Sequence, residues 1–297
     1  MEYNEIIVKN PKPKEKIYSY LRRNGISENY IKNLRKKEGY ILKNGAVAHS
    51  DNYVSDNDVI SLCKNPNTRT SIMLCTLPLD IVYEDDDILI INKPSGVSIL
   101  ASRSHYCENI SGAILNYMLP KDPNFVVRIV GRLDIDTSGL FIVAKHSLIA
   151  NLLSLKRDNI VKIYYAIIMG EIRNIITINK NIDTVKNDKG FNDRKRVITD
   201  FGGKPAITHV YPVAFDGKNT LCRINIEHGR THQIRLHLSS INHPLIGDEL
   251  YGIKSEEISH AALICKEIKL VNPINGKKIE LSIDYPEDFK HAFNSIL

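Results

Sequence analysis

A short segment at 131–140 places two carboxylates among turn residues, between two apolar segments. The apolar segments, 125–130 and 139–144, have the composition of buried strands. A carboxylate on a loop between buried strands is held rigidly and still faces a cleft, so Asp134 or Asp136 could act as a nucleophile or stabilise a developing charge. The residue types fit equally well an ordinary acidic turn whose carboxylates cap backbone amides.

A second segment, 227–237, gathers two arginines and three histidines where an apolar strand pattern ends. Gly229 ends the strand, and Thr231 is predicted to cap a helix over 231–241, in which apolar residues recur every three to four positions. Arg235 lies near the start of this helix. A guanidinium that faces a carboxylate from this position keeps the carboxylate ionised.

The spacing of candidate ligands disfavours both metal binding and disulfides. His228 and His232 are four residues apart, as in a helical zinc site, but Gly229 interrupts the helix that such a site needs. The five cysteines are odd in number and contain no Cys-x-x-Cys pair, which argues against a zinc ribbon or a disulfide framework. We therefore predict that no metal is bound and that the cysteines are buried, reduced thiols.

The segments that must position these residues mix strand and helix patterns without a regular order. Strands are predicted at 81–83, 87–92, 125–130, 139–144, 163–169 and 221–227, and helices at 111–118, 147–155 and 231–241. Because no β-α-β rhythm is present, we predict an α+β domain over 79–297, preceded by a linker at 66–78. The polar, turn-rich segment 180–204 is predicted to be a mobile insertion.

The net charge of +6 is confined to the start of the chain. Residues 1–45 hold 11 lysines and arginines against 5 acidic residues, whereas the remaining residues hold 29 of each sign. A basic segment joined to a neutral body suggests a module that binds a polyanion. A solvated, lysine-rich surface fits the charge equally well.

The pattern of this basic segment resembles the S4 RNA-binding domain over residues 12–65. Helices are predicted at 14–24 and 28–38, and strands at 40–43 and 58–63. On the second helix Lys32, Arg35 and Lys36 share one face. The resemblance implies a small αα-β domain that lays this face along RNA phosphates, with salt-sensitive affinity that depends little on base sequence.

Composition and hydropathy favour a globular, cytoplasmic protein. With 43% hydrophobic and 25% charged residues, the chain is near the globular average, which argues against a fibrous or wholly disordered protein. The longest uninterrupted apolar run, 163–169, is too short to cross a bilayer. The first residues do not have the charged and then apolar pattern of a signal peptide.

Five ordered motifs resemble those of the RluA-type pseudouridine synthases of ribosomal and transfer RNA, over nearly the whole chain. They are Asn92-Lys93-Pro94-Ser95-Gly96; Arg132-Leu133-Asp134 with Thr137-Ser138-Gly139; Lys162, Tyr164 and Ala166; the segment 229–235; and His243-Pro244 with Gly247-Asp248 and Tyr251-Gly252. Each motif alone is weak, but five in order are specific. The chain departs from the family at Gly131, where a histidine usually precedes Arg-Leu-Asp.

The resemblance implies a mixed, mostly antiparallel central sheet flanked by helices, with Asp134 as the essential carboxylate. Arg235 would pair with Asp134, and Tyr164 would stack on the target base. A base must leave its stack before it can react, and Arg132 would fill the space left behind. Lys93, Arg230 and His232 would shape the cleft or contact the RNA backbone.

The predicted function is the isomerisation of specific uridines in structured RNA to pseudouridine, by a monomer that needs no cofactor and no metal. The expected substrate is large-subunit ribosomal RNA, with transfer RNA as the other candidate. A catalytically inactive RNA-binding or ribosome-assembly factor is the alternative, and Gly131 is the feature that favours it. A metal-dependent hydrolase that uses the histidines is a weaker third interpretation. Pseudouridine formed in the presence of a chelator would support the synthase, RNA binding without pseudouridine the inactive factor, and chelator-sensitive cleavage of RNA the hydrolase.

Overall fold

An antiparallel four-stranded sheet with two short helices forms the N-terminal unit. The computed structural model describes residues 3–34, 39–64, 72–100, 108–155, 159–186 and 192–293. The sheet has the order β1-β4-β2-β3, formed by β1 (Tyr3–Ile7), β2 (Gly39–Lys43), β3 (Ala46–Ala48) and β4 (Val59–Lys64). Its helices are α1 (Ile17–Arg23) and α2 (Glu28–Asn33). Because β1 precedes residue 12, this sheet begins before the predicted boundary of the unit.

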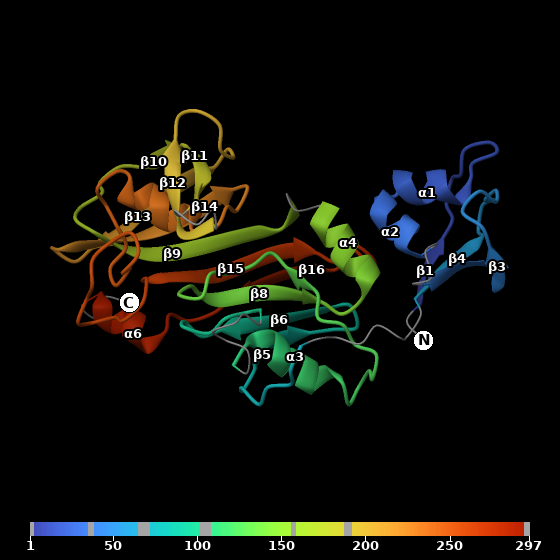
Figure 1. The fold of residues 1–297 in the computed structure, drawn as a ribbon, viewed down its shortest axis with the longest axis horizontal. Helices are drawn as coiled ribbons and strands as arrows, with labels where there is room; N and C mark the ends of the chain where they lie inside the picture. Colours follow the sequence, from blue (N-terminus) through green and yellow to red (C-terminus); the bar gives the residue numbers. More distant parts are fainter. Residues whose placement is uncertain are drawn as a thin grey trace.

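The larger unit is built on a ten-stranded sheet with the path β10-β13-β14-β9-β15-β8-β6-β5, to which β16 and β7 add beside β15 and β8 (Figure 1). Its strands are β5 (Asp80–Glu84), β6 (Ile88–Lys93), β7 (Ile129–Val130), β8 (Ser138–Ala144), β9 (Val161–Met169), β10 (Ile176–Asn179), β13 (Ile207–Phe215), β14 (Asn219–Glu227), β15 (Leu263–Val271) and β16 (Lys278–Ser282). Among the described residues only β15 and β8 pair in parallel. The predicted α+β fold with a mixed, mostly antiparallel sheet is confirmed.

Four helices cover the two faces of this sheet: α3 (Ile110–Met118), α4 (Ser147–Leu155), α5 (Gln233–Ser239) and α6 (Glu287–Ala292). The apolar side of α5 packs on the face of β9 that carries Tyr164, and α6 packs on the opposite face. β8 is buried at all seven positions, which explains its uninterrupted apolar sequence. In the part of the chain that the structure describes, no helix is both long and apolar enough to span a bilayer.

The segment 180–204, predicted to be a mobile insertion, instead contains a β-hairpin. Its strands, β11 (Asn181–Lys186) and β12 (Asn192–Thr199), pair in antiparallel register. Ile182 and Ile198 of the hairpin pack against Leu236 of α5. These few apolar side chains anchor a hairpin whose polar composition resembles that of a loop, which is why the sequence pattern was misleading.

The burial of the described cysteines agrees with the prediction that they are buried thiols. Cys63, Cys75, Cys222 and Cys265 are buried and free. Cys107 lies outside the described residues. Burial raises the pKa of the Cys222 thiol to about 12, so this thiol is protonated and inert.

The two units share an apolar core through α4. Leu148 and Leu152 belong to the same buried cluster as the apolar residues of α1, α2 and the N-terminal sheet. The Tyr30 and Ser147 hydroxyl groups are 3.1 Å apart, and Asn151 Nδ2 donates to Gly25 O at 3.2 Å. Figure 1 shows α4 between the central sheet and the N-terminal unit. The N-terminal unit is therefore packed against the larger unit rather than only tethered to it.

We expect Leu152→Asp to detach the N-terminal unit from α4, because the substitution places a charge in a buried apolar contact. The molecule should expand, as measured by the radius of gyration from small-angle scattering. Leu155→Asp is the matched control, since Leu155 lies on the same helix and is 52% exposed. An unchanged radius for Leu152→Asp would show that the shared core does not hold the units together.

Candidate active site

The loop 131–137 joins β7 to β8 and is clamped by the residues that follow β6. Gly96 N donates to Ile135 O at 3.0 Å, and Ser95 Oγ donates to Asp136 O at 2.8 Å. A turn within the loop is closed by a bond of 3.2 Å from Thr137 N to Asp134 O. The first sequence motif, 92–96, thus fixes the backbone of the loop that contains the second motif. It thereby fixes the positions of the Asp134 and Asp136 carboxylates.

Lys93 is the central part of this clamp. Its ammonium donates to three carbonyl oxygens, those of Pro94 and Ile135 at 2.8 Å and that of Val97 at 2.9 Å. The residue is fully buried. Burial lowers the pKa of Lys93 to about 8, against the opposing charges of Asp136 and Asp134. The predicted RNA contact of Lys93 is contradicted, because all three protons are used inside the protein.

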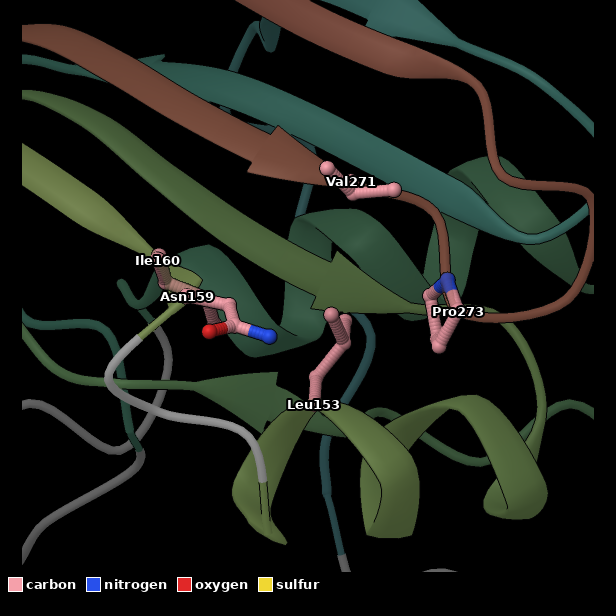
Figure 2. A pocket seen from close by; sticks show the side chains of 5 residues that line it. All are labelled: Leu153, Asn159, Ile160, Val271 and Pro273. Atoms are coloured by element: carbon pink, nitrogen blue, oxygen red, sulfur yellow. The ribbon is translucent and has the colours of Figure 1, made fainter.

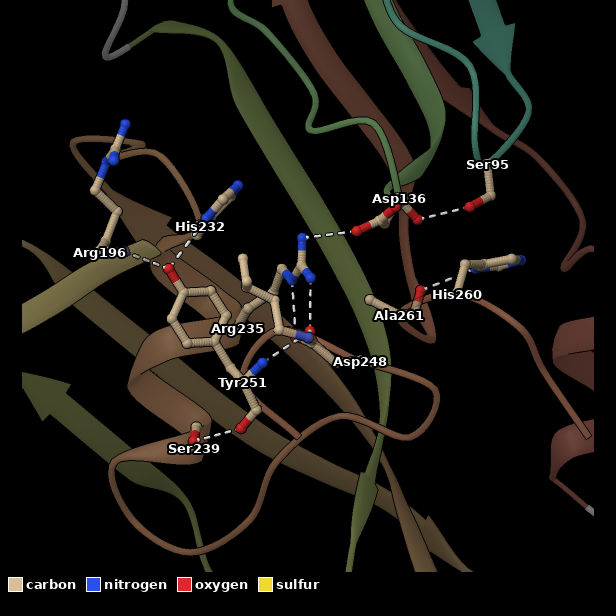
Figure 3. A network of polar contacts seen from close by, with 11 residues as sticks. Ser95, Asp136, Arg196, His232, Arg235, Ser239, Asp248, Tyr251, His260 and Ala261 are labelled. Atoms are coloured by element: carbon tan, nitrogen blue, oxygen red, sulfur yellow. Dashed lines mark hydrogen bonds and ion pairs between the residues drawn. The ribbon is translucent and has the colours of Figure 1, made fainter. Parts of the chain in front are cut away.

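Arg235 joins α5 to the loop. Its Nε and Nη2 atoms donate to the two Asp248 carboxylate oxygens at 2.7 and 2.6 Å, and its Nη1 atom is 3.0 Å from Asp136 Oδ2 (Figure 3). The predicted pairing of Arg235 with Asp134 is therefore wrong as a direct contact. The partner from the loop is Asp136, and the bidentate partner is Asp248 of the following segment.

The Arg235–Asp248 pair is almost completely removed from solvent, with side-chain exposures of 3% and 0%. Burial alone would raise the pKa of Asp248, but the hydrogen bonds and positive charge of Arg235 outweigh it and lower that pKa. The Asp248 carboxylate also accepts hydrogen bonds from Leu250 N and Tyr251 N. Both Asp248 carboxylate oxygens therefore accept hydrogen bonds. These bonds hold the carboxylate rigidly, so that it fixes the position of the Arg235 guanidinium.

Asp134 differs from both of these carboxylates. It is half-buried, and no hydrogen bond or ion pair links its side chain to another residue in the described part of the chain. Its charge nevertheless acts on Lys93, Tyr164, His232 and Arg235. An anion that is surrounded by polar groups but leaves its lone pairs free is suited to react with, or stabilise, an electron-poor carbon.

Tyr164 lies on β9, on the face that α5 covers, and pairs in register with Cys265 of β15. Burial raises the pKa of Tyr164 well above its ordinary value, and the Cys265 and Asp134 groups act in the same direction. The hydroxyl therefore keeps its proton. Tyr165 lies on the opposite face, where its hydroxyl donates to Glu267 at 3.1 Å. The two neighbouring tyrosines therefore lie on opposite faces of the sheet, and Tyr164 is the one on the side of α5.

The start of α5 departs from the predicted cap. The residue before the helix is His232, in a left-handed conformation with φ of 58°, and Thr231 does not cap it. Gln233 replaces the cap: its Oε1 accepts from Arg230 N, and its Nε2 donates to the carbonyls of Ile207 and Glu227. The buried side-chain amide of Gln233 thus links the start of α5 to β13 and β14. The left-handed backbone of His232 sets the direction of its ring.

Of the remaining predicted cations, Arg132 lies in the loop and Arg230 lies just before α5. Arg132 is exposed, as a side chain that enters RNA must be. Arg230 is half-buried and donates through Nε to Pro205 O at 3.1 Å. Gly131 has φ of +72°, and a Cβ there would lie 3.0 Å from Lys162 Nζ. The glycine at this position is therefore explained by its backbone conformation and by the nearby lysine.

On the N-terminal unit, one of the three predicted RNA-binding cations can be placed. Lys32 is exposed on α2 and forms an ion pair of 2.7 Å with Glu28. Arg35 and Lys36 lie outside the described residues. An exposed i, i+4 pair of this kind holds its lysine only weakly, so Lys32 can exchange its partner for a phosphate.

Two of the histidines between 228 and 243 make hydrogen bonds within the fold. His237 is buried between Thr208 Oγ1 and Lys180 O, and His243 Nδ1 lies 2.9 Å from Met169 O. Within the described ranges, no three His, Cys, Asp or Glu side chains are grouped as metal ligands. His237 and His243 therefore act as hydrogen-bonding groups of the fold.

A small cavity lies away from these residues (Figure 2). It is lined by Leu153, Asn159, Ile160, Val271 and Pro273. Val271 is six residues from Cys265 along β15, or about 20 Å at the usual rise of a strand. The cavity is therefore not part of the candidate active site.

Sequence reasoning placed Asp134, Tyr164 and Arg235 in one site but missed three residues that hold them there. Asp248 and Tyr251 stood within a quoted motif without an assigned role, and Gln233 was interpreted only as part of a helix. The available signal was a polar residue in an otherwise apolar, buried segment, since such a residue needs a partner.

Comparison with known proteins gives a consistent result. The sequence model of a family described as RNA pseudouridylate synthase matches residues 87–240. The chain is 31% identical over 273 residues to an uncharacterized RNA pseudouridine synthase of Bacillus subtilis, YjbO, covering 89% of this chain and 93% of the relative. It is 32% identical over 273 residues to the ribosomal large subunit pseudouridine synthase D of Pseudomonas aeruginosa, covering 85% and 82%.

Solved structures agree on the fold. The solved structure of the human protein named RNA Pseudouridylate Synthase Domain Containing 4 superposes on this chain with a TM-score of 0.56 at 21% identity. The match covers 73% of this chain and 92% of that chain. The corresponding human protein domain containing 1 gives a TM-score of 0.54 at 24% identity, covering 70% and 84%. At these identities the likeness concerns the fold alone.

Proposed function

Because the chain belongs to the RNA pseudouridylate synthase family and is an RNA pseudouridine synthase, we propose that its substrate is structured large-subunit ribosomal RNA. The observation that carries the proposal is the similarity, along most of both chains, to relatives whose names state that they act on the large ribosomal subunit. We also propose that the protein acts in the cytoplasm as a monomer.

The reaction is an isomerisation, in which the bond from N1 of uracil to C1′ of ribose breaks and a bond from C5 to C1′ forms. The proton lost from C5 is balanced by the proton gained at N1. We propose that Asp134 is the essential carboxylate, as a nucleophile or as an anion beside the electron-poor centre. The free lone pairs of Asp134 and the backbone of its loop, which Lys93 holds through Ile135 O, support this assignment.

We propose that Arg235 acts through Asp136 and Asp248, by fixing the loop that carries Asp134 against α5. Tyr164 would stack on the target base and supply a neutral hydroxyl beside it. Arg132 would fill the space that the base leaves, and Arg230 and His232 would line the cleft. On the N-terminal unit Lys32, Arg35 and Lys36 would contact phosphates, which positions the RNA without reading its sequence.

The test is pseudouridine mapping on purified components. Transcripts of large-subunit ribosomal RNA and of transfer RNA are incubated with the full-length protein in the presence of a chelator, then treated with carbodiimide and read by primer extension. We expect pseudouridine at discrete positions of the ribosomal transcript. Modification of transfer RNA alone would overturn the substrate assignment, and absence of pseudouridine from both would overturn the function.

We expect Lys93→Met to lower kcat about 10- to 100-fold, because the clamped loop would lose its position, while the affinity for RNA is unchanged. The three carbonyls would lose their donor, so stability should fall by about 1–3 kcal/mol. Urea denaturation, single-turnover assays and filter binding measure the three quantities. A loss of RNA affinity without a loss of kcat would instead restore Lys93 as an RNA-binding residue.

A further inference from the structure

Tyr251, in the turn that follows Asp248, lies where three segments of the site meet. Arg196 N of β12 donates to the Tyr251 hydroxyl oxygen at 2.6 Å, and His232 Nδ1 is 3.1 Å from the same atom. The Arg235 guanidinium carbon lies 5.6 Å from the centre of the Tyr251 ring. One side chain therefore contacts the hairpin, the start of α5 and the arginine that holds the catalytic loop (Figure 3).

The ring and the hydroxyl of Tyr251 have separate roles. The ring packs with Ile182 and Ile198 of the hairpin against Leu236, and lies edge-to-face with His232. These contacts need only an aromatic ring. The hydroxyl makes the two polar contacts, so a phenylalanine at this position separates packing from hydrogen bonding.

The direction of the hydrogen bonds can be assigned from the donors present. A backbone N–H can only donate, so Arg196 uses a lone pair of the Tyr251 oxygen. Burial raises the pKa of Tyr251, and the hydroxyl therefore keeps its own proton. Among the described residues, His232 Nδ1 is the acceptor that this proton can reach. Tyr251 therefore donates to Nδ1.

His232 is neutral under ordinary conditions. Burial lowers its pKa; the charges of Asp134 and Asp248 oppose this effect, and those of Arg235 and Arg196 add to it. A neutral imidazole whose Nδ1 accepts a hydrogen bond carries its proton on Nε2. In Figure 3 the second ring nitrogen of His232 points away from Tyr251. The ring thus presents an N–H donor on its side away from Tyr251.

We propose that Tyr251 is a positioning residue of this site, which fixes His232 as an Nε2–H donor toward an acceptor oxygen of the RNA and locks the β11–β12 hairpin onto α5. This inference rests on the proposed function for its RNA partner. The tautomer of His232 can be tested without activity.

The kinetic test is Tyr251→Phe in the full-length protein. We expect the single-turnover rate constant to fall about tenfold, because the donor is no longer fixed. The acid limb of the rate profile should move to higher pH by about 0.5–1 unit, since loss of the donated hydrogen bond favours protonated His232. In the His232→Ala background, Tyr251→Phe should have little further effect. Tyr165→Phe, which loses a hydroxyl bond on the opposite face, should match wild type.

The structural test is the ¹⁵N spectrum of the imidazole groups, with the His232 signals identified by their absence in His232→Ala. We expect the Nε2–H form in wild type and a mixture of tautomers in Tyr251→Phe. An Nδ1–H form in wild type, an unmoved acid limb, or additive effects in the double variant would each overturn the proposal. If wild type makes no pseudouridine, the proposed function fails, while the spectrum still decides the role of Tyr251.

Discussion

We expect Asp134→Asn to abolish pseudouridine formation, with a loss of at least about 10³-fold in the single-turnover rate constant. The amide has nearly the shape of the carboxylate but lacks its charge, so it can neither attack a carbon nor stabilise positive charge. No hydrogen bond or ion pair of a described residue depends on the Asp134 side chain. We therefore expect unchanged thermal stability and RNA affinity, measured by calorimetry and filter binding.

Asp136→Asn is the control that the structure offers. Asp136 is two residues away on the same loop, its side chain is 40% exposed, and it forms the ion pair with Arg235. Because the asparagine oxygen can still accept a hydrogen bond from Arg235 Nη1, the loop keeps part of its attachment, and the rate should fall far less than in Asp134→Asn. If Asp136→Asn abolished activity and Asp134→Asn did not, Asp136 would be the essential carboxylate. The position of the family motif would then identify the wrong residue in this chain.

The sequence predicted well those elements whose pattern is local. β6, β8 and β9 are apolar runs bounded by turn residues, and their burial confirms the interpretation. β13 was missed, because its residues alternate between buried and half-exposed and Pro212 lies at a bulge, where the sequence reads as a broken strand. Long-range pairing, rather than local propensity, determines such strands.

The same distinction applies to the site. Motif order predicted that Asp134, Tyr164 and Arg235 share one site, because Tyr164 and Arg235 lie on predictable elements and Asp134 lies in the loop before a predictable strand. Which carboxylate Arg235 contacts depends on how the segment after α5 folds back, and no spacing reveals that Asp248 is enclosed. Lys93 is the clearest example of a residue whose environment the local sequence does not predict. A lysine before proline is typical of a surface turn, and only three converging carbonyls explain why it is buried.

The second large effect concerns the buried ion pair. Arg235→Met is expected to lower the free energy of unfolding by about 3–5 kcal/mol, because it leaves the Asp248 carboxylate buried without its bidentate partner. Activity should be lost as well, since the loop carrying Asp134 loses its attachment to α5. Urea denaturation and single-turnover assays measure the two effects.

The destabilisation caused by Arg235→Met should depend on pH, because the substitution changes the pKa of Asp248. In wild type the pKa of Asp248 is lowered, so its contribution to stability is present above the pKa of the unfolded chain and lost as the pH falls through the folded value. Without Arg235, only the two backbone N–H donors oppose burial, which is the largest influence, and the pKa of Asp248 should rise. The variant then takes up a proton more readily when folded, so the stability gap from wild type should narrow as the pH is lowered from 7.5 to about 5.

The double variant Arg235→Met with Asp248→Leu separates stability from catalysis. Replacing both members of a buried pair by apolar groups removes the uncompensated charge, so most of the lost stability should return. Activity should not return, because Asp136 still lacks the guanidinium that fixes the loop. A double variant that regained both would show that the pair only fills space. A single variant destabilised by less than about 1 kcal/mol would show that the pair does not anchor the site.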